Sequence, residues 1–104
     1  MKIARIVFIS LAFIAAVVSV TGTSVAEPGH DWDAVAWCES AGDWHISTGN
    51  GYYGGLQFLS ATWWAYGGGP GLPHEYTREE QIRVAENVLA GQGPGAWPVC
   101  GRYL

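Results

Sequence analysis

The chain has 104 residues, enough for one domain, and its 9 acidic and 5 basic residues give a formal charge of −4 at pH 7. An acidic chain is a poor candidate for binding nucleic acid or an anionic membrane surface, so those functions are set aside. The 6 tryptophans and 5 tyrosines suit either a compact core or a groove that stacks on sugar rings.

The first 26 residues have the pattern of a secretory signal peptide. Lys2 and Arg5 form a positive region, residues 6–20 are an almost unbroken apolar run, and Ser24-Val25-Ala26 is a small-x-small cleavage pattern. The run is shorter than the roughly 20 residues that span a bilayer, although an uncleaved N-terminal anchor is the alternative. Cleavage would leave residues 27–104 as a secreted domain with three arginines, no lysine and nine acidic residues, a formal charge of −6.

The first helix is expected to begin at His30 or Asp31. Asp31 and Asp33 carry the negative charge that suits the positive end of a helix, and Gly42 is expected to end it. Helical spacing places four residues on one face: Trp32, Val35, Ala36 and Glu39.

Glu39 lies in the last turn of this expected helix, next to Cys38 and between Trp37 and Trp44. The negative end of the helix dipole and desolvation by tryptophan both disfavour the charged carboxylate, so we expect a raised pKa. A carboxyl group that holds its proton in an aromatic cleft suits general acid catalysis and the cleavage of a glycosidic bond. The alternative is a solvated glutamate at a helix end.

Cys38 and Cys100 are the two cysteines of the chain, and secretion favours a disulfide between them. The alternative is a zinc ion held by both cysteines with His30, His45 or His74. The histidines lack the paired spacing of a zinc site, so the disulfide is the stronger interpretation.

A short β-hairpin is predicted within residues 45–58, because aromatic and β-branched residues flank the turn signal Asn50-Gly51. Gly54 and Gly55 would allow another group to approach the backbone closely. Ser60 is expected to cap a short helix over residues 61–66, followed by a loop over residues 67–76.

Thr77-Arg78-Glu79-Glu80 forms a capping box that opens the last helix. The helix is expected to end at Gly91, with Arg78 and Arg83 on a solvated face. Its apolar face carries Ile82, Ala85, Val88 and Leu89. The expected fold class is α+β and mostly helical, a small domain with one hairpin in which Cys100 returns to the first helix.

Two stretches of the chain resemble the resuscitation-promoting factor domain of actinobacteria. They are WDAVAWCESAGDWHISTGNGYYGGLQFLSATW, residues 32–63, and TREEQIRVAENVLAGQGPGAWPVC, residues 77–100. The resemblance covers essentially all of residues 27–104. It implies a lysozyme-like or lytic-transglycosylase-like fold and a secreted enzyme that cleaves peptidoglycan and promotes the resuscitation or growth of dormant cells.

The resemblance also implies roles for individual residues. The family's catalytic acid falls on Glu39, and its disulfide falls on Cys38 and Cys100. Residues that contact the glycan fall on Gln57, Thr62 and Gln92, and two matching aromatic positions, Tyr53 and Trp63, either stack on sugar or pack. Gln57 as a plain strand residue and Thr62 bonded to its own helix are the alternatives without a function.

The chain departs from the family pattern in ways that bear on mechanism. Ala41 and Asp43 stand where many members have glycine and asparagine, and Leu59 stands where some members have an acidic residue. A glycosidase that hydrolyses its substrate normally uses two carboxyl groups, whereas a lytic transglycosylase needs one. Asp43 is expected to be a solvated residue at the helix exit, so we favour the transglycosylase route.

The resemblance implies peptidoglycan glycan strands as substrate, cooperation with a peptidoglycan endopeptidase, and no cofactor or metal. No residue marks a docking surface for that enzyme, and we expect a monomer. A noncatalytic module that binds wall glycan, or a secreted signalling module, is the alternative function, because a fold does not fix a function.

Overall fold

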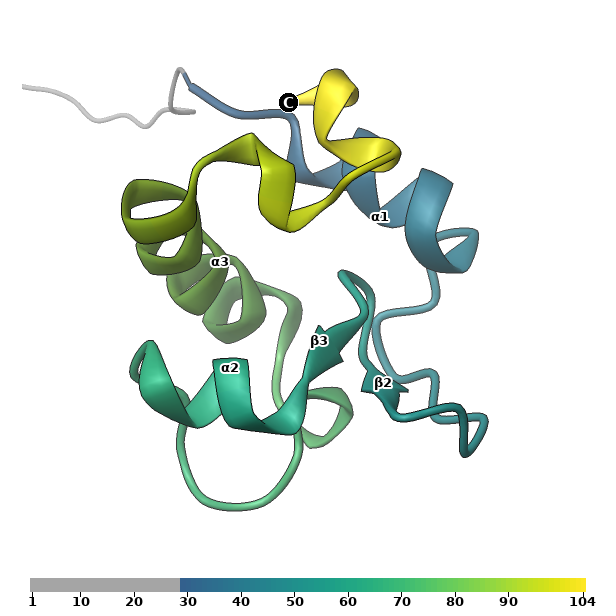
Figure 1. Ribbon diagram of the computed structural model, residues 1–104. Coiled ribbons are helices and arrows are strands. Elements are labelled where there is room, and N and C mark those ends of the chain that lie inside the picture. The colour runs from purple at the N-terminus through teal and green to yellow at the C-terminus, as the bar shows by residue number, and fades with distance from the viewer. Residues whose placement is uncertain (1–28) are drawn as a thin grey trace, which may run out of the picture.

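The computed structural model describes residues 29–104, so the expected signal peptide, residues 1–26, lies outside the described part of the chain. The elements follow in the order α1 (Trp32–Ser40), β2 (Tyr52–Tyr53), β3 (Phe58–Leu59), α2 (Ser60–Ala65), η2 (Pro73–Glu75), α3 (Arg78–Gln92), η3 (Pro94–Ala96) and η4 (Cys100–Tyr103), where η denotes a 3₁₀ helix (Figure 1). Within residues 29–104, no helix is long and apolar enough to cross a membrane. The fold is therefore mostly helical with one small sheet, as predicted.

Helix α1 begins with a side-chain cap and ends on a left-handed residue. The carboxylate of Asp31 accepts a hydrogen bond from the backbone N–H of Ala34 at 3.0 Å. Ala41 adopts φ 56° and closes the helix one residue before Gly42, where the end was expected. The position of Glu39 in the last turn is confirmed.

The hairpin exists, but its turn is not where the sequence places it. Strands β2 and β3 pair antiparallel, Tyr52 with Leu59 and Tyr53 with Phe58, so the connecting turn is residues 54–57. The Asn50-Gly51 turn lies in the preceding loop, where a single bridge joins Ser47 to Tyr53. The chain does bend at Asn50-Gly51, but the prediction that this bend connects the two strands of the hairpin is wrong.

Helix α2 includes Ser60 as its first residue, and Leu59 precedes the helix without a side-chain cap. The capping role expected for Ser60 is therefore wrong. The following loop, residues 67–76, contains the 3₁₀ helix η2. The indole N–H of Trp63 donates to the carbonyl of Gly69 at 3.0 Å and thus ties this loop back to α2.

Helix α3 begins at the cap that the sequence predicts, because the Thr77 hydroxyl accepts from the N–H of Glu80 at 3.1 Å. It ends at Gln92, one residue beyond Gly91. Arg78 is partly exposed, and it makes two hydrogen bonds to Asp33 of α1 at 2.8 and 2.7 Å. This ion pair joins the start of α3 to the start of α1.

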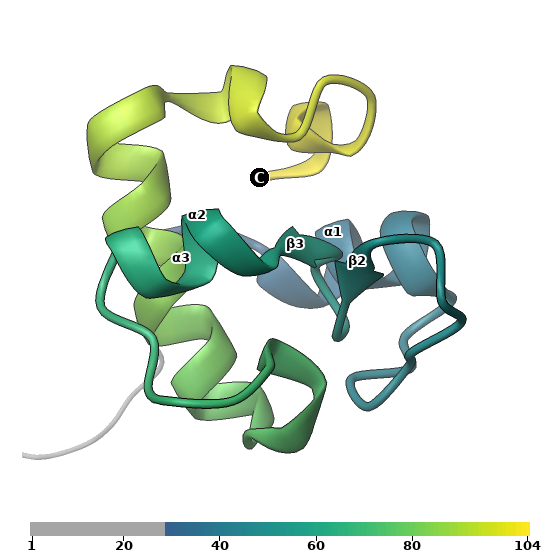
Figure 2. The ribbon, with the colours of Figure 1, turned by 60° about the horizontal axis from the view of Figure 1, so that its bottom comes forward.

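The core lies where α1, α3 and the hairpin meet. Trp32 and Trp97 are 3% and 5% exposed and pack edge to face at 5.0 Å. Six further residues of the core are wholly shielded from solvent: Val35, Ala36, Leu56, Trp63, Val84 and Ala85. In Figures 1 and 2 the C-terminal segment runs beside α1 and above α2 and β3.

A disulfide joins Cys38 in α1 to Cys100 in η4, with Cα atoms 5.7 Å apart. The predicted bridge is confirmed, and no cysteine is free within residues 29–104. The zinc alternative is wrong because both sulfurs are consumed by the bridge. The bridge fixes the C-terminal segment beside the last turn of α1.

Candidate active site

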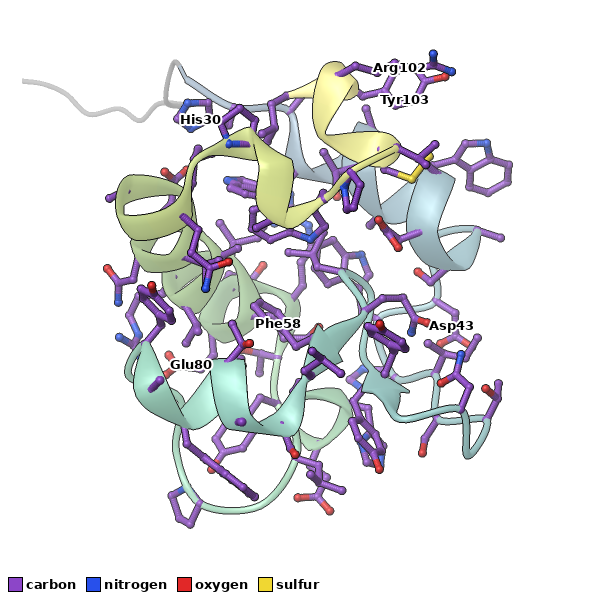
Figure 3. All side chains as sticks on the ribbon, in the orientation of Figure 1. His30, Asp43, Phe58, Glu80, Arg102 and Tyr103 are labelled. Carbon is purple, nitrogen blue, oxygen red and sulfur yellow. A yellow bond between two sulfur atoms is a disulfide. The ribbon has the colours of Figure 1, made fainter. Side chains whose placement is uncertain are left out.

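A groove of about 420 Å³ opens between the last turn of α1, the hairpin, α2 and the C-terminal segment. Figure 3 shows Phe58, one of its lining residues, in the middle of the molecule. We call this feature the groove. It is lined by Glu39, Tyr52, Gln57, Phe58, Leu59, Thr62, Val88, Gln92, Ala96, Trp97, Pro98, Val99 and Cys100.

Glu39 enters the groove from the last turn of α1 and is half-buried. Desolvation by burial raises the pKa of its carboxyl group. Within residues 29–104, no ion pair involves this side chain, so no cation lowers the pKa again. The carboxyl group therefore has the environment of a proton donor.

Glu39 is the single acidic residue among those that line the groove. Asp43, the other carboxyl group near the end of α1, is exposed and lies at the right of Figure 3. Its carboxylate accepts a hydrogen bond from the N–H of His45 at 3.0 Å, an arrangement typical of a chain leaving a helix. No second carboxyl group faces Glu39 across the described groove.

The structure brings Gln57, Thr62 and Gln92 together with Glu39 in the groove. Gln57 ends the hairpin turn with φ 56°, an uncommon conformation for a residue other than glycine. Its amide nitrogen donates to the carbonyl of Gly54 at 3.1 Å, which leaves one N–H and the amide oxygen for a ligand. Thr62 comes from α2, and Gln92 is the last residue of α3.

Two aromatic residues expected as possible sugar contacts lie outside the groove lining. Trp63 is wholly buried and packs on Phe58 at 5.2 Å. Tyr53 is half-buried, and its ring stacks on His74 at 5.5 Å. In the structure, both residues therefore pack against neighbouring side chains, which was the alternative to stacking on sugar.

Tyr52 is a lining residue that the sequence reasoning missed. Successive residues of a strand point to opposite faces, so only one of the adjacent tyrosines can face the groove. Without the pairing register, the sequence does not indicate which one. Alternate residues of a strand share a face, so the sequence could have assigned Tyr52 to the groove only if the face of β2 that packs on the core had been known.

The C-terminal wall of the groove was also missed. Pro98, Val99 and Cys100 line it, and the disulfide fixes this wall beside Glu39. Val99 is 66% exposed, and the indole N–H of Trp97 donates to the carbonyl of Leu56 at 3.0 Å. The position of the two cysteines was the signal that could have placed these residues next to the acid.

Comparison with known proteins gives one family match. Residues 26–100 match a family model described as a transglycosylase-like domain. The described part of the groove lies wholly within these residues.

Curated relatives are similar over most of the chain. Resuscitation-promoting factor Rpf1 of Corynebacterium glutamicum is 54% identical over 97 residues, which cover 91% of this chain and 50% of the relative. Resuscitation-promoting factor RpfA of Mycobacterium tuberculosis is 49% identical over 105 residues, 99% of this chain and 26% of the relative. Resuscitation-promoting factor RpfE of M. tuberculosis is 65% identical over 72 residues, 69% of this chain and 41% of the relative. The chain thus spans half or less of the length of each of these three.

Proposed function

The chain belongs to the resuscitation-promoting factor family and carries its transglycosylase-like domain, and from this premise we propose that it is a peptidoglycan-cleaving enzyme with Glu39 as its general acid. One observation carries the proposal. Glu39 is half-buried with a raised pKa and is the one acidic residue that lines the described groove. The proposed bond is the glycosidic link between N-acetylmuramic acid and N-acetylglucosamine.

The proposed reaction begins with proton transfer from Glu39 to the glycosidic oxygen. The bond from that oxygen to C1 of the muramic acid breaks, and the leaving sugar departs with the proton as a hydroxyl group. The acetamido oxygen of the substrate stabilises the positive charge that develops at C1. The remaining groove residues, polar and apolar, are uncharged, so they can position a sugar chain without competing for this charge.

The second half of the reaction uses Glu39 as a base. Its carboxylate accepts the proton of the muramic acid 6-hydroxyl, whose oxygen bonds to C1 and closes an anhydro ring. Glu39 is protonated again and no water is consumed. The lack of a second carboxyl group in the described groove supports this transglycosylase route over hydrolysis, which normally uses two.

The biological setting is part of the same proposal. We place the protein outside the cell at the cell wall, where the product of its reaction promotes the resuscitation or growth of dormant cells. The relatives carry that activity in their names, and this chain covers only part of their length. Cooperation with a peptidoglycan endopeptidase and a monomeric state stay predictions.

A matched pair of variants tests the assignment. Glu39→Gln keeps the shape and removes the transferable proton, so we expect release of fragments from purified peptidoglycan to fall at least about 100-fold. Asp43→Asn removes the other nearby carboxylate but keeps an oxygen for the N–H of His45, so activity should stay within about twofold of wild type. Mass spectrometry of the products should find anhydromuramic ends.

Three outcomes would contradict parts of the proposal. Full activity of Glu39→Gln would remove Glu39 as the acid. Reducing ends in place of anhydro ends, together with a large loss in Asp43→Asn, would establish hydrolysis with two carboxyl groups. Binding of glycan by the wild type without any release of fragments would favour the noncatalytic wall-binding module.

A further inference from the structure

The β2–β3 pair is too short to set its own position in the domain. Each strand contributes two residues, and even a longer two-stranded hairpin is only marginally stable alone. This hairpin nevertheless carries Tyr52, Gln57 and Leu59 into the same groove as Glu39. The contacts that hold its turn, residues 54–57, therefore decide where Gln57 lies relative to Glu39.

Gly55 is the residue at which the rest of the domain holds this turn. Its N–H donates to the amide oxygen of Gln81 at 3.0 Å, and its carbonyl accepts from the hydroxyl of Ser40 at 2.8 Å, both in buried surroundings. A Cβ atom at this position would lie 2.5 Å from the ring of Trp44. Side chains from α3 and α1 thus occupy both backbone polar groups of one glycine.

Gln81 connects the turn to two further segments. It is wholly buried, and its amide nitrogen donates to the carbonyl of Trp44 at 2.8 Å and to that of Tyr76 at 3.0 Å. Both N–H donors and the oxygen of the amide are therefore paired. A buried amide with every partner in place fixes the segments that it joins, because moving any one of them leaves a polar group unpaired.

Ser40 connects the turn to the catalytic end of α1. It directly follows Glu39, and its hydroxyl lies 3.0 Å from the carbonyl of Ala36 and 2.8 Å from that of Gly55. A hydroxyl has one proton, so the two carbonyls share it. This is a direct polar link between the last turn of α1 and the hairpin turn.

We propose that Ser40 and Gln81 are positioning residues that hold the hairpin turn against α1 and so set the placement of Gln57 relative to Glu39. The inference rests on the proposed function, in which Glu39 is the acid and Gln57 contacts the glycan. The left-handed backbone of Gln57 agrees with it, since such a conformation persists only where the surroundings impose it. A misplacement of about 1 Å between reacting groups can cost about 100-fold in rate.

The test is Ser40→Ala, which leaves the buried carbonyl of Gly55 without its side-chain donor. At a temperature well below its melting point, we expect kcat on peptidoglycan to fall about tenfold or more while KM changes less than about twofold. The pH at which activity declines should stay unchanged, because Glu39 is still present. Ser40→Thr, which retains the hydroxyl, should restore most of kcat.

Val84→Ala is the matched control. Val84 is wholly buried on α3 and does not line the groove, so its truncation should lower the melting temperature at least as much while kcat stays near wild type. A folded Ser40→Ala protein with wild-type kcat would overturn the positioning role. So would an equal loss of kcat in Val84→Ala, since general destabilisation would then explain both.

A second variant covers the case in which Ser40→Ala does not fold. In Gly54→Ala the new Cβ would lie 2.4 Å from the amide oxygen of Gln81, and the backbone at this position is left-handed with φ 80°, so either the turn or the Gln81 amide must move and the link between them is disturbed. The same loss of kcat is expected, and wild-type kcat would overturn the inference. A wild-type protein that releases no glycan fragments overturns the proposed function and this role together, whereas a fully active Ser40→Ala protein overturns this role alone.

Discussion

Glu39 is a carboxyl group whose surroundings disfavour its charged form. Burial raises its pKa, and its place in the last turn of α1 puts it near the negative end of the helix dipole. Each of these effects costs the folded protein stability once the group ionises. The candidate site therefore lowers the stability of the folded protein, as is common for residues that act chemically.

The cost should be measurable as a function of pH. Because the folded-state pKa of Glu39 lies above the unfolded value of about 4.3, its contribution to stability is fully present below that value and is lost as the pH rises through the folded-state pKa. Glu39→Gln should therefore have a higher melting temperature than wild type at pH 7, because its neutral amide carries no cost of ionisation. The gap should close near pH 4.

Thermal unfolding followed by circular dichroism at several pH values checks this expectation. The proposed activity should decline around and above the folded-state pKa of Glu39, the pH at which the stability gap stops growing, because both depend on the proton of Glu39. A gap that does not vary with pH would contradict the role of ionisation. A wild type with a higher melting temperature than Glu39→Gln at pH 7 would contradict the predicted direction of the effect.

Single residues also show how far the sequence could predict the site. Glu39 could be singled out because its position in the last turn of a helix is a local feature. The expected aromatic cleft around it is not formed by Trp37 and Trp44, since Trp37 is 70% exposed and neither residue lines the groove. Tyr53 and Trp63 could not be assigned to core or groove, because their direction depends on strand register and on which face of α2 meets Phe58. Whether an aromatic side chain points into the core or into the groove depends on how its helix or strand packs, which the local sequence does not specify.

At the scale of elements, α3 supports the rest of the domain. Its buried face carries Val84, Ala85 and Val88 into the core, its first turn is linked to α1 by Arg78, and its last residue, Gln92, reaches the groove. The Arg78–Asp33 pair lies partly in solvent, so it orients the two helices more than it stabilises them. The helix depends more on its cap and its core contacts.

Thr77→Ala should show the value of that cap. The loss of the hydroxyl leaves the N–H of Glu80 without its side-chain acceptor and should cost about 1 kcal/mol, a fall of about 4–8 °C in melting temperature. Thr48→Ala, at an exposed threonine in a loop, is the matched control and should change little. An equal fall in both variants, measured by calorimetry, would mean that the cap contributes nothing specific.

The elements differ in how well local sequence predicts them. The starts of α1 and α3 could be predicted because Asp31 and Thr77 are caps that act within a few residues. The hairpin turn could not, because the local signal at Asn50-Gly51 competes with contacts that Gly54 and Gly55 make to Gln81 and Trp44. Those contacts join residues about 10 to 30 positions apart and leave no trace in a short window of sequence.

At the scale of the whole molecule, the domain is small and relies on a covalent link. Chains of this size bury a limited apolar core, and the bridge between Cys38 and Cys100 closes a loop of 62 positions. In the chain-entropy model such a loop is worth about 4 kcal/mol, a large share of the stability of a small domain. The bridge also holds the C-terminal wall of the groove in place.

Reduction should therefore destabilise the domain strongly. We expect the melting temperature in the presence of a strong reductant to fall by about 10 °C or more, with loss of the proposed activity. The matched control is the double variant Cys38→Ser, Cys100→Ser, whose melting temperature should already be low and should not respond to reductant. An unchanged melting temperature of the wild type in reductant would show that the core alone sustains the fold.

The same bridge has a topological effect. Every residue that lines the groove, from Glu39 to Cys100, belongs to the covalent ring that Cys38 and Cys100 close. A protease that nicks the backbone once inside this ring, for example in the exposed stretch around Pro70, leaves both fragments tethered in one molecule. In the extracellular setting that we propose, where proteases are common, the groove would then survive a single nick as one covalent unit.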